Sequence, residues 1–181
     1  KSWDVASTVS SAALADNSYA QFKRRVGNKY TPRSFSGGAL TPGIPASDGA
    51  IYWLASGNVS IGGDVGTSKV VLLADGNVTI TSNLTFGSGG SLAVLAGGNI
   101  SVDPAVTNLQ GVYLAQGTFD TGASATPLQI DGSVAGLTGV GLRRTATGAT
   151  PAELFTYHPE YLTNLPSALL RRYQFKEELV P

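Results

Sequence analysis

Four copies of one short motif recur along the middle of this chain, and this repeat restricts the folds open to it. The copies read "LASGNVSI" from residue 54, "LADGNVTI" from residue 73, "LAGGNISV" from residue 95 and "LAQGTFDT" from residue 114. Their glycines are separated by 19, 22 and 19 residues. A period near 20 residues is typical of a solenoid, in which each repeat forms one coil and buries its core against its neighbours.

Each repeat has the pattern of a strand, a Gly-Asn corner and a second strand. After the corner, apolar residues alternate with polar ones, as at Val59 and Ile61, which predicts a strand with one buried face. A weaker fifth copy, "IDGSVAGL", begins at residue 130. We therefore expect an all-β fold, a short right-handed β-solenoid (β-helix) of about five coils over residues 50–145, with a helical N-terminal flank and a capping C-terminal tail.

Four Asn-x-Ser/Thr triplets lie in this region, and three of them fall at the repeated corner. Gly and Asn tolerate the positive φ that a sharp corner requires, and stacked Asn side chains can hydrogen-bond along the axis as a ladder. Glycosylation of these asparagines is the alternative interpretation, and it stays open for Asn83, which lies outside the repeat register. The predicted corner ladder consists of Gly57, Asn58, Gly76, Asn77, Gly98, Asn99 and Gly117.

The strand before each corner is apolar on both sides, as in "VVLLA" over residues 70–74. A strand with one side in water should alternate, so the outer side of this sheet is expected to be covered by another part of the chain or by another subunit. Large apolar patches mark such interaction surfaces. The predicted interaction stripe consists of Leu54, Leu73, Leu95 and Leu114, one residue from each coil.

Residues 1–30 have no repeat and are expected to form a helical flank that docks on this stripe. Val5, Val9 and Phe22 are the predicted docking residues, and the flank is basic where the solenoid is acidic, which favours docking. Residues 31–49, rich in Pro and Gly, are predicted to be an extended connector. The flank can dock on its own solenoid or, through this connector, on a neighbour's, and the connector's length slightly favours the neighbour.

Residues 146–181 form an aromatic, proline-containing tail that suits a cap over the solenoid's open end or side. Two arginines at the last coil, Arg143 and Arg144, are expected to pair with the acidic tail residues Glu177 and Glu178. The predicted tail cap consists of Phe155, Tyr157, Tyr161 and Leu165.

Composition argues against several kinds of chemistry. The chain has no Cys and one His, His158, so we expect no metal site, no cofactor and no catalytic residues. Twelve Lys and Arg residues balance twelve Asp and Glu residues, which gives no reason to expect nucleic acid as a partner. No run of 18 apolar residues occurs, so no transmembrane segment is predicted.

The "GNVTI" coils, the "GVYLAQGTFDTG" coil and the tail "PAELFTYHPEYLTNLP" together resemble a C-terminal β-solenoid domain of bacterial surface and pilus-associated proteins. The similarity covers about residues 50–181. It implies exposure outside the cell, at the cell surface, and a structural or adhesive role, and it carries no catalytic residues over. A weaker similarity connects the coils to bactofilin-like polymer-forming β-helices.

Three functions remain open at this point. The first is a non-enzymatic structural protein, extracellular, that assembles with other copies into a homo-oligomer, a bacterial surface filament or a layer. The second is a carbohydrate-binding adhesin module at a pilus or fibre tip, with surface glycans as partners. The third is a polysaccharide-active β-helix enzyme, which would need clustered carboxylates.

Overall fold

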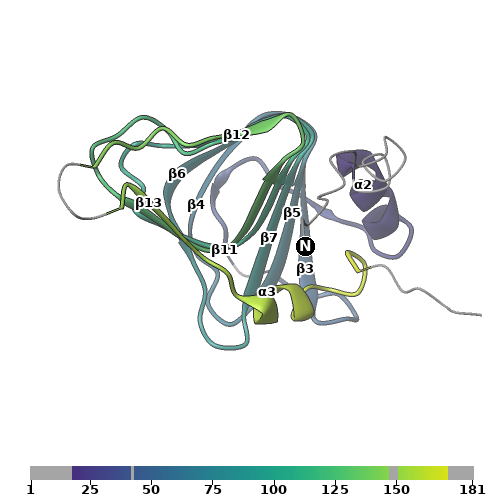
Figure 1. Cartoon of the computed structure of the whole chain (residues 1–181). Helices are drawn as coiled ribbons and strands as arrows, with labels where there is room; N and C mark the ends of the chain where they lie inside the picture. The colour runs from purple at the N-terminus through teal and green to yellow at the C-terminus, as the bar shows by residue number, and fades with distance from the viewer. Residues whose placement is uncertain (1–17, 42, 147–150, 171–181) are drawn as a thin grey trace, which may run out of the picture.

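Parallel strands stacked in coils make up most of this molecule. The computed structural model describes residues 18–41, 43–146 and 151–170. Within them the strands form a β-solenoid of about six coils, and two short helices lie outside it (Figure 1). The predicted all-β solenoid is confirmed, with about one coil more than expected.

The strands and helices follow in a regular order along the chain. Most coils contribute one strand before the Gly-Asn corner and one after it. The helices are α2 (Tyr19–Gly27) and α3 (Pro159–Thr163). The strands are β1 (Arg33–Ser34), β2 (Gly38–Ala39), β3 (Ala50–Ala55), β4 (Val59–Asp64), β5 (Lys69–Ala74), β6 (Val78–Thr85), β7 (Ser91–Ala96), β8 (Ile100–Val102), β9 (Asn108–Ala115), β10 (Thr118–Asp120), β11 (Leu128–Gly136), β12 (Gly139–Gly141) and β13 (Glu153–Thr156).

The coils have three faces. The first face runs β1-β3-β5-β7 and continues through the second halves of β9 and β11. The second face, beyond the corner, contains β8, β10, β12 and the first halves of β4 and β6. The third face joins the ends of β4 and β6 to the first halves of β9 and β11 and then to β13.

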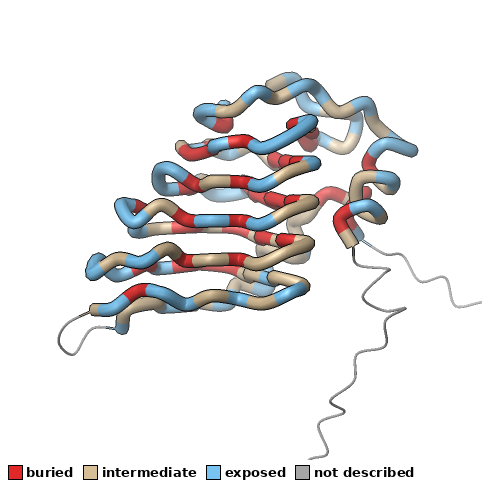
Figure 2. Tube along the Cα trace, turned by 90° about the horizontal axis from the view of Figure 1, so that it is seen from above, coloured by how far each residue is buried: buried red, intermediate tan, exposed pale blue. Residues whose placement is uncertain are grey.

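Coil stacking keeps each repeat position in one column (Figure 2). Leu54 lies opposite Leu73, Leu73 opposite Leu95, and Leu95 opposite Leu114. The column ends at Ala135 on β11. The sequence repeat therefore becomes a row of identical positions along the solenoid axis.

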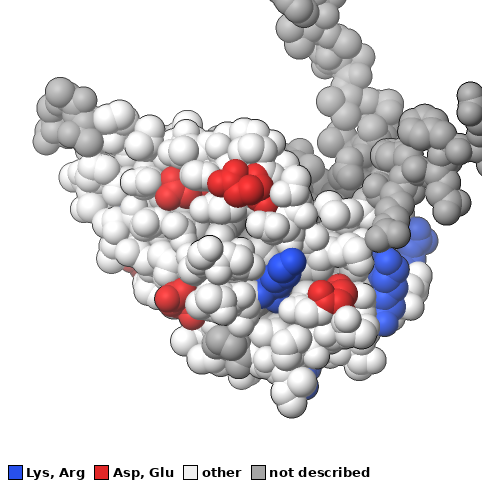
Figure 3. Space-filling model, turned by 90° about the horizontal axis from the view of Figure 1, so that it is seen from below, with Lys and Arg blue, Asp and Glu red and all other residues white. Residues whose placement is uncertain are grey.

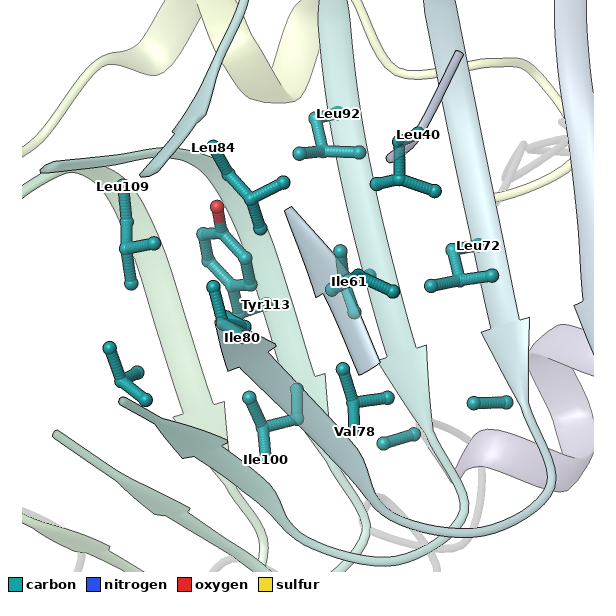
Figure 4. Packing of buried hydrophobic residues seen from close by; sticks show 14 of the residues in the cluster. Leu40, Ile61, Leu72, Val78, Ile80, Leu84, Leu92, Ile100, Leu109 and Tyr113 are labelled. Carbon is teal, nitrogen blue, oxygen red and sulfur yellow. The ribbon is translucent and has the colours of Figure 1, made fainter. Parts of the chain in front are cut away.

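The interior of the solenoid is filled by branched apolar side chains. Alternation on β4, β6 and β8 turns Val and Ile inward and Ser and Thr outward, as the repeat predicted. Burying each such side chain stabilises the fold by about 1.5 to 3 kcal/mol. Figure 4 labels Leu40, Ile61, Leu72, Val78, Ile80, Leu84, Leu92, Ile100, Leu109 and Tyr113 in this cluster.

A second apolar cluster lies outside the first face. Helix α2 and the segment after α3 pack on the outer sides of β3, β5 and β7. These strands are therefore buried on both sides, which explains why they do not alternate. The outer cluster consists of Tyr19, Val26, Ala50, Tyr52, Val71, Leu73, Ala93, Leu95, Ala168 and Leu169.

Residues 31–49 differ from the extended connector that composition predicted. Strand β1 pairs with β3 and β2 pairs with β4, so this segment forms an incomplete first coil. Leu40 is fully buried in the interior, and the ring of Phe35 lies 5.7 Å from that of Trp53. Phe35 and Leu40 pack against the apolar core at the first full coil. The segment therefore covers the N-terminal end of the core.

Candidate interaction surfaces

The repeated corner carries a ladder of hydrogen bonds along the solenoid. The side-chain Oδ1 of Asn58 accepts the backbone N–H of Asn77 at 2.8 Å, and Oδ1 of Asn77 accepts that of Asn99 at 2.8 Å. Oδ1 of Asn99 accepts the N–H of Thr118 at 2.8 Å. The bonds run from side chain to backbone and not between side chains, so each Asn satisfies a donor of the following coil.

The glycines of these corners have a different role from the one that the sequence suggested. None of the four has a positive φ. A Cβ added at Gly76 would clash with Asn58 Oδ1 and would lie only 2.7 Å from the Asn58 backbone N. Gly98 and Gly117 meet the preceding ladder Asn in the same way, whereas Gly57, in the first full coil, has nothing within 4 Å. Close approach of the ladder side chain therefore requires the glycine.

Asn83, which fits no repeat position, belongs to a separate set of bonds between coils. Its Oδ1 accepts the backbone N–H of Thr107 at 2.9 Å and that of Asn108 at 3.1 Å. Its side-chain amide donates to Thr107 Oγ1 at 3.3 Å. This side chain therefore connects the end of β6 to the start of β9.

Replacing one ladder residue should lower stability measurably. Asn77→Ala removes an acceptor of one charge-neutral hydrogen bond, so we expect the free energy of unfolding to fall by about 1 kcal/mol. Chemical denaturation followed by circular dichroism measures this. Ser60→Ala, an exposed outward position on the second face, is the control and should change stability by less than about 0.5 kcal/mol. Equal stability of both variants would contradict the ladder.

The predicted interaction stripe is covered in its middle and open at its end. Leu73 and Leu95 are buried in the outer cluster, whereas Leu54 and Leu114 are partly exposed. Among the predicted docking residues, Phe22 lies against this cluster, and Val5 and Val9 lie outside the described residues. The cover comes from α2 on one side and from Leu165, Ala168 and Leu169 on the other.

Helix α2 is anchored to the solenoid by an acidic side chain at a corner. Asp75 Oδ1 accepts a hydrogen bond from Tyr19 Oη at 2.8 Å and lies 2.6 Å from Lys23 Nζ. The N–H of Tyr19 donates to Gln116 Oε1 at 2.9 Å. At the far end of the segment, Tyr30 stacks on Tyr52, with ring centroids 4.7 Å apart.

These contacts place α2 on its own solenoid. Sequence reasoning left both arrangements open and leaned to a neighbouring copy because the connector was long. In the single chain the connector is folded into the first coil, and α2 packs on the outer sides of β3, β5 and β7. The basic flank does meet the acidic solenoid, at Lys23 and Asp75.

Acid should weaken this anchor. Burial raises the pKa of Asp75, but the hydrogen bonds from Lys23 and Tyr19 and the charge of Lys23 outweigh it, so the pKa is lowered overall. A lowered pKa contributes stability above the unfolded value, and this is lost as pH falls through the folded value, below about pH 4. We expect the melting temperature to fall less between pH 7 and pH 3 in Asp75→Asn than in the wild type. Asp64→Asn is the control, and a wild-type pH profile in Asp75→Asn would contradict the anchor.

The tail divides into three parts with different contacts. Strand β13 pairs with β11 as part of the last coil, and Leu165, Ala168 and Leu169 cover the first face. Between them Tyr161 packs edge-on against Phe86 at 4.8 Å. Of the four predicted cap residues, Tyr161 and Leu165 make such contacts, while Phe155, on β13, and Tyr157 are partly exposed to solvent.

The C-terminal end of the solenoid presents apolar side chains at the position of the interior. Val140 is in register with the buried Phe119 and is 44% exposed, and Phe155 is in register with the buried Ile130 and is 41% exposed. Leu142, just after β12, is 57% exposed. In the described part of the chain, β12 pairs only with β10, and β13 only with β11. We call Val140, Leu142 and Phe155 with these two strand edges the open end.

Arg144 is the buried cation of the last coils, and its contacts differ from the predicted pairing with the acidic tail. Its guanidinium donates to the backbone carbonyls of Thr121, Pro104, Thr126 and Asp103 at 2.8 to 3.2 Å. Its neighbour Arg143 is exposed, with Nε 2.8 Å from Asp120 Oδ2. Glu177 and Glu178 lie outside the described residues.

A second group of titratable side chains surrounds His158. Its Nδ1 lies 2.7 Å from Glu160 Oε1, and its Nε2 lies 4.0 Å from Asp131 Oδ1. The ring stacks on Tyr161 at 4.8 Å. These contacts hold the tail against β11. Within residues 18–41, 43–146 and 151–170, no group of three or more His, Cys, Asp or Glu residues is arranged to bind a metal ion.

Charge is dispersed over the face of the molecule that Figure 3 shows. In the view of Figure 3, acidic and basic side chains stand singly or in small groups among uncharged residues, and neither sign forms a continuous patch. A surface that binds nucleic acid is typically basic and continuous, and this face has no such patch. No helix in the described part of the chain is long and apolar enough to cross a membrane.

A shallow polar groove of about 390 Å³ crosses the second face. Hydroxyl and amide groups line it together with the Asp120–Arg143 ion pair. Its polar lining residues are Asn77, Thr79, Asn99, Ser101, Thr118, Asp120 and Arg143.

Sequence reasoning missed the open end and the role of Arg144. The last coil is the weakest copy of the repeat, so the inward positions of Val140 and Phe155 become visible only once the register is known. The isolated basic pair at the end of an acidic solenoid was a signal for Arg144, but it did not identify backbone carbonyls as the partners. Comparisons with family models, with curated proteins and with solved structures find no significant match to this chain.

Proposed function

We propose that this chain is a non-enzymatic structural subunit that assembles with other copies through the ends of its solenoid. The observation that carries the proposal is the open end. Val140 and Phe155 lie there in register with interior residues, with the exposed Leu142 just after β12, beside two strand edges without a second neighbour among the described residues. Unpaired strand edges are templates for pairing with another chain, and end coils need a cap.

The opposite end offers a partner surface of matching kind. Strands β1 and β2 each have one strand neighbour in the described residues, so their outer edges can pair with a further coil. Ile44, which follows β2 in the sequence, is exposed. Contact between the open end of one copy and the first coil of the next is heterologous, and such contacts extend into filaments when they do not close into a ring.

A location outside the cell, on a bacterial surface, is part of the proposal. It is supported by the resemblance of the coils and of the tail "PAELFTYHPEYLTNLP" to surface and pilus-associated domains. Extended surface structures are built from repeated subunits, and a solenoid with two complementary ends meets that need.

A charge at the open end should prevent assembly. Phe155→Lys places an ammonium group where a phenyl ring would be buried by the next copy, and burying such a ring is worth about 1.5 to 3 kcal/mol. Because 1.4 kcal/mol is a factor of ten, we expect the concentration needed for polymers to rise at least about tenfold. Sedimentation velocity over a concentration series measures this.

Leu154→Lys is the matched control for that variant. Leu154 is the adjacent residue of the same strand and is similarly exposed, but its register partner is the outward-facing Gln129, so it points to the side of the solenoid. We expect Leu154→Lys to polymerise like the wild type. Equal loss of polymers in both variants, or in neither, would contradict assembly through the ends.

Carbohydrate binding is a second candidate, favoured by the polar groove on the second face. Its hydroxyl, amide and charged groups are of the kind that hydrogen-bond sugar hydroxyls. We expect a chain with this function to bind glycans on an array as a monomer, and Arg143→Met to weaken that binding. Glycan binding without polymers would favour an adhesin module over a structural subunit.

A further inference from the structure

An apolar groove of about 300 Å³ remains on the outer side of the first face. Leu95, Leu114 and Ala135 form its floor, one from each of β7, β9 and β11. Phe22 of α2 borders it, and so do Leu162 and Leu165 of the tail. Helix α2 and the tail bury Leu73 completely, cover Leu114 in part and leave Ala135 exposed.

The course of the chain shows what lies next to this groove. Tyr19, at the start of α2, is bonded to Gln116, which follows β9, whereas Tyr30, after the helix, stacks on Tyr52 of β3. From its start to its end, the segment thus runs from the coil of β9 toward the coil of β3. The described chain therefore begins, at Ser18, beside the coil of β9, whose next neighbour is β11 with Ala135.

We propose that residues 1–17 of the same chain bind in this groove and complete the cover of the first face over β9 and β11. These residues directly precede Ser18, and they carry Val5 and Val9, with Ala12 and Ala13, at a spacing of four and three residues. Apolar residues at this spacing are typical of a segment that lays one face into an apolar groove. The nine residues between Val9 and Tyr19 span roughly 30 Å when extended, which is enough to cross the neighbouring coils to Ala135.

Paired cysteines in the full chain test this proposal without interference, because the protein has no native Cys. We would combine Val9→Cys with Ala135→Cys and treat the protein with a short bis-maleimide. The control combines Val9→Cys with Thr79→Cys, which lies on the second face. Docking in the same chain is expected to give at least tenfold more intramolecular cross-link in the first variant than in the control.

Two results would overturn the proposal. Covalent dimers as the main product would show that the groove binds a second copy. Equal cross-linking in both variants would show that residues 1–17 do not bind in the groove. A second measurement uses Ala135→Cys alone, whose thiol should react with a maleimide several-fold faster after deletion of residues 1–17. Thr79→Cys should react at the same rate in both lengths, and circular dichroism reports whether the shortened chain stays folded.

Discussion

Replacing Arg144 by Met is expected to cause the largest loss of stability of any single change considered for this protein, about 3 to 5 kcal/mol. Arg144 is 5% exposed, and its guanidinium donates to four backbone carbonyls from two loops, the one between β8 and β9 and the one between β10 and β11. Methionine fills similar volume but donates nothing, so these carbonyls would lose the guanidinium donor, among them the carbonyl of the fully buried Thr121. The melting temperature should fall by roughly 10 °C or more.

Arg143→Met is the matched control, since it removes the same side chain one residue earlier. The side chain of Arg143 is 64% exposed and contacts one carboxylate, Asp120, at 2.8 Å. Exposed ion pairs contribute little, so we expect a loss of less than about 1 kcal/mol. Thermal unfolding of both variants measures the two losses of stability. Losses of similar size would show that Arg144 does not hold the last coils together.

The second large effect is expected at a corner glycine. Gly76→Ala puts a methyl group against Asn58 Oδ1 and the Asn58 backbone N, which lies only 2.7 Å from the new atom. The methyl group meets backbone atoms on one side and the ladder side chain on the other, so it cannot be accommodated by a side-chain movement alone. The two coils must therefore separate locally. Such overpacking costs about 1 to 3 kcal/mol, and the lost ladder bond adds about 1 kcal/mol.

Gly57→Ala provides the contrast at the same repeat position. No coil with a ladder Asn precedes it, nothing lies within 4 Å of its new methyl group, and its φ is not positive. Alanine there should be neutral or should stabilise by about 0.5 kcal/mol, because it restricts the unfolded chain. Denaturant unfolding compares the two, and a loss at Gly57 as large as at Gly76 would mean that the corner requires glycine for its backbone conformation.

The repeat made much of the fold predictable. The period and the alternation of apolar residues identified the coils. The strands that are apolar on both sides identified a covered face, because the same pattern recurs in each repeat. The ladder residues Asn58, Asn77 and Asn99 followed from the same period. These inferences use spacing alone, and spacing is what a solenoid preserves.

Contacts between non-repeated parts could not be predicted in this way. The Pro- and Gly-rich residues 31–49 have the composition of a connector, yet Leu40 is buried in the interior, since an open first coil offers more apolar surface than composition reveals. Similarly, β9 and β11 serve two faces each by bending at Gly111 and Gly132, where φ is +126° and +134°. The weak repeat copy "IDGSVAGL" placed Gly132 at a corner, whereas it pairs with Gly111 in the middle of the two strands.

Electron microscopy of the purified chain over a concentration series tests the central claim, assembly through the solenoid ends, most directly. We expect unbranched filaments one solenoid wide that lengthen with concentration, because open-end residues Val140 and Phe155 meet the first coil of the next copy. The strand spacing along each filament should be about 4.8 Å, continuous across subunits. Dispersed monomers at high concentration, or particles joined through their sides, would contradict the claim.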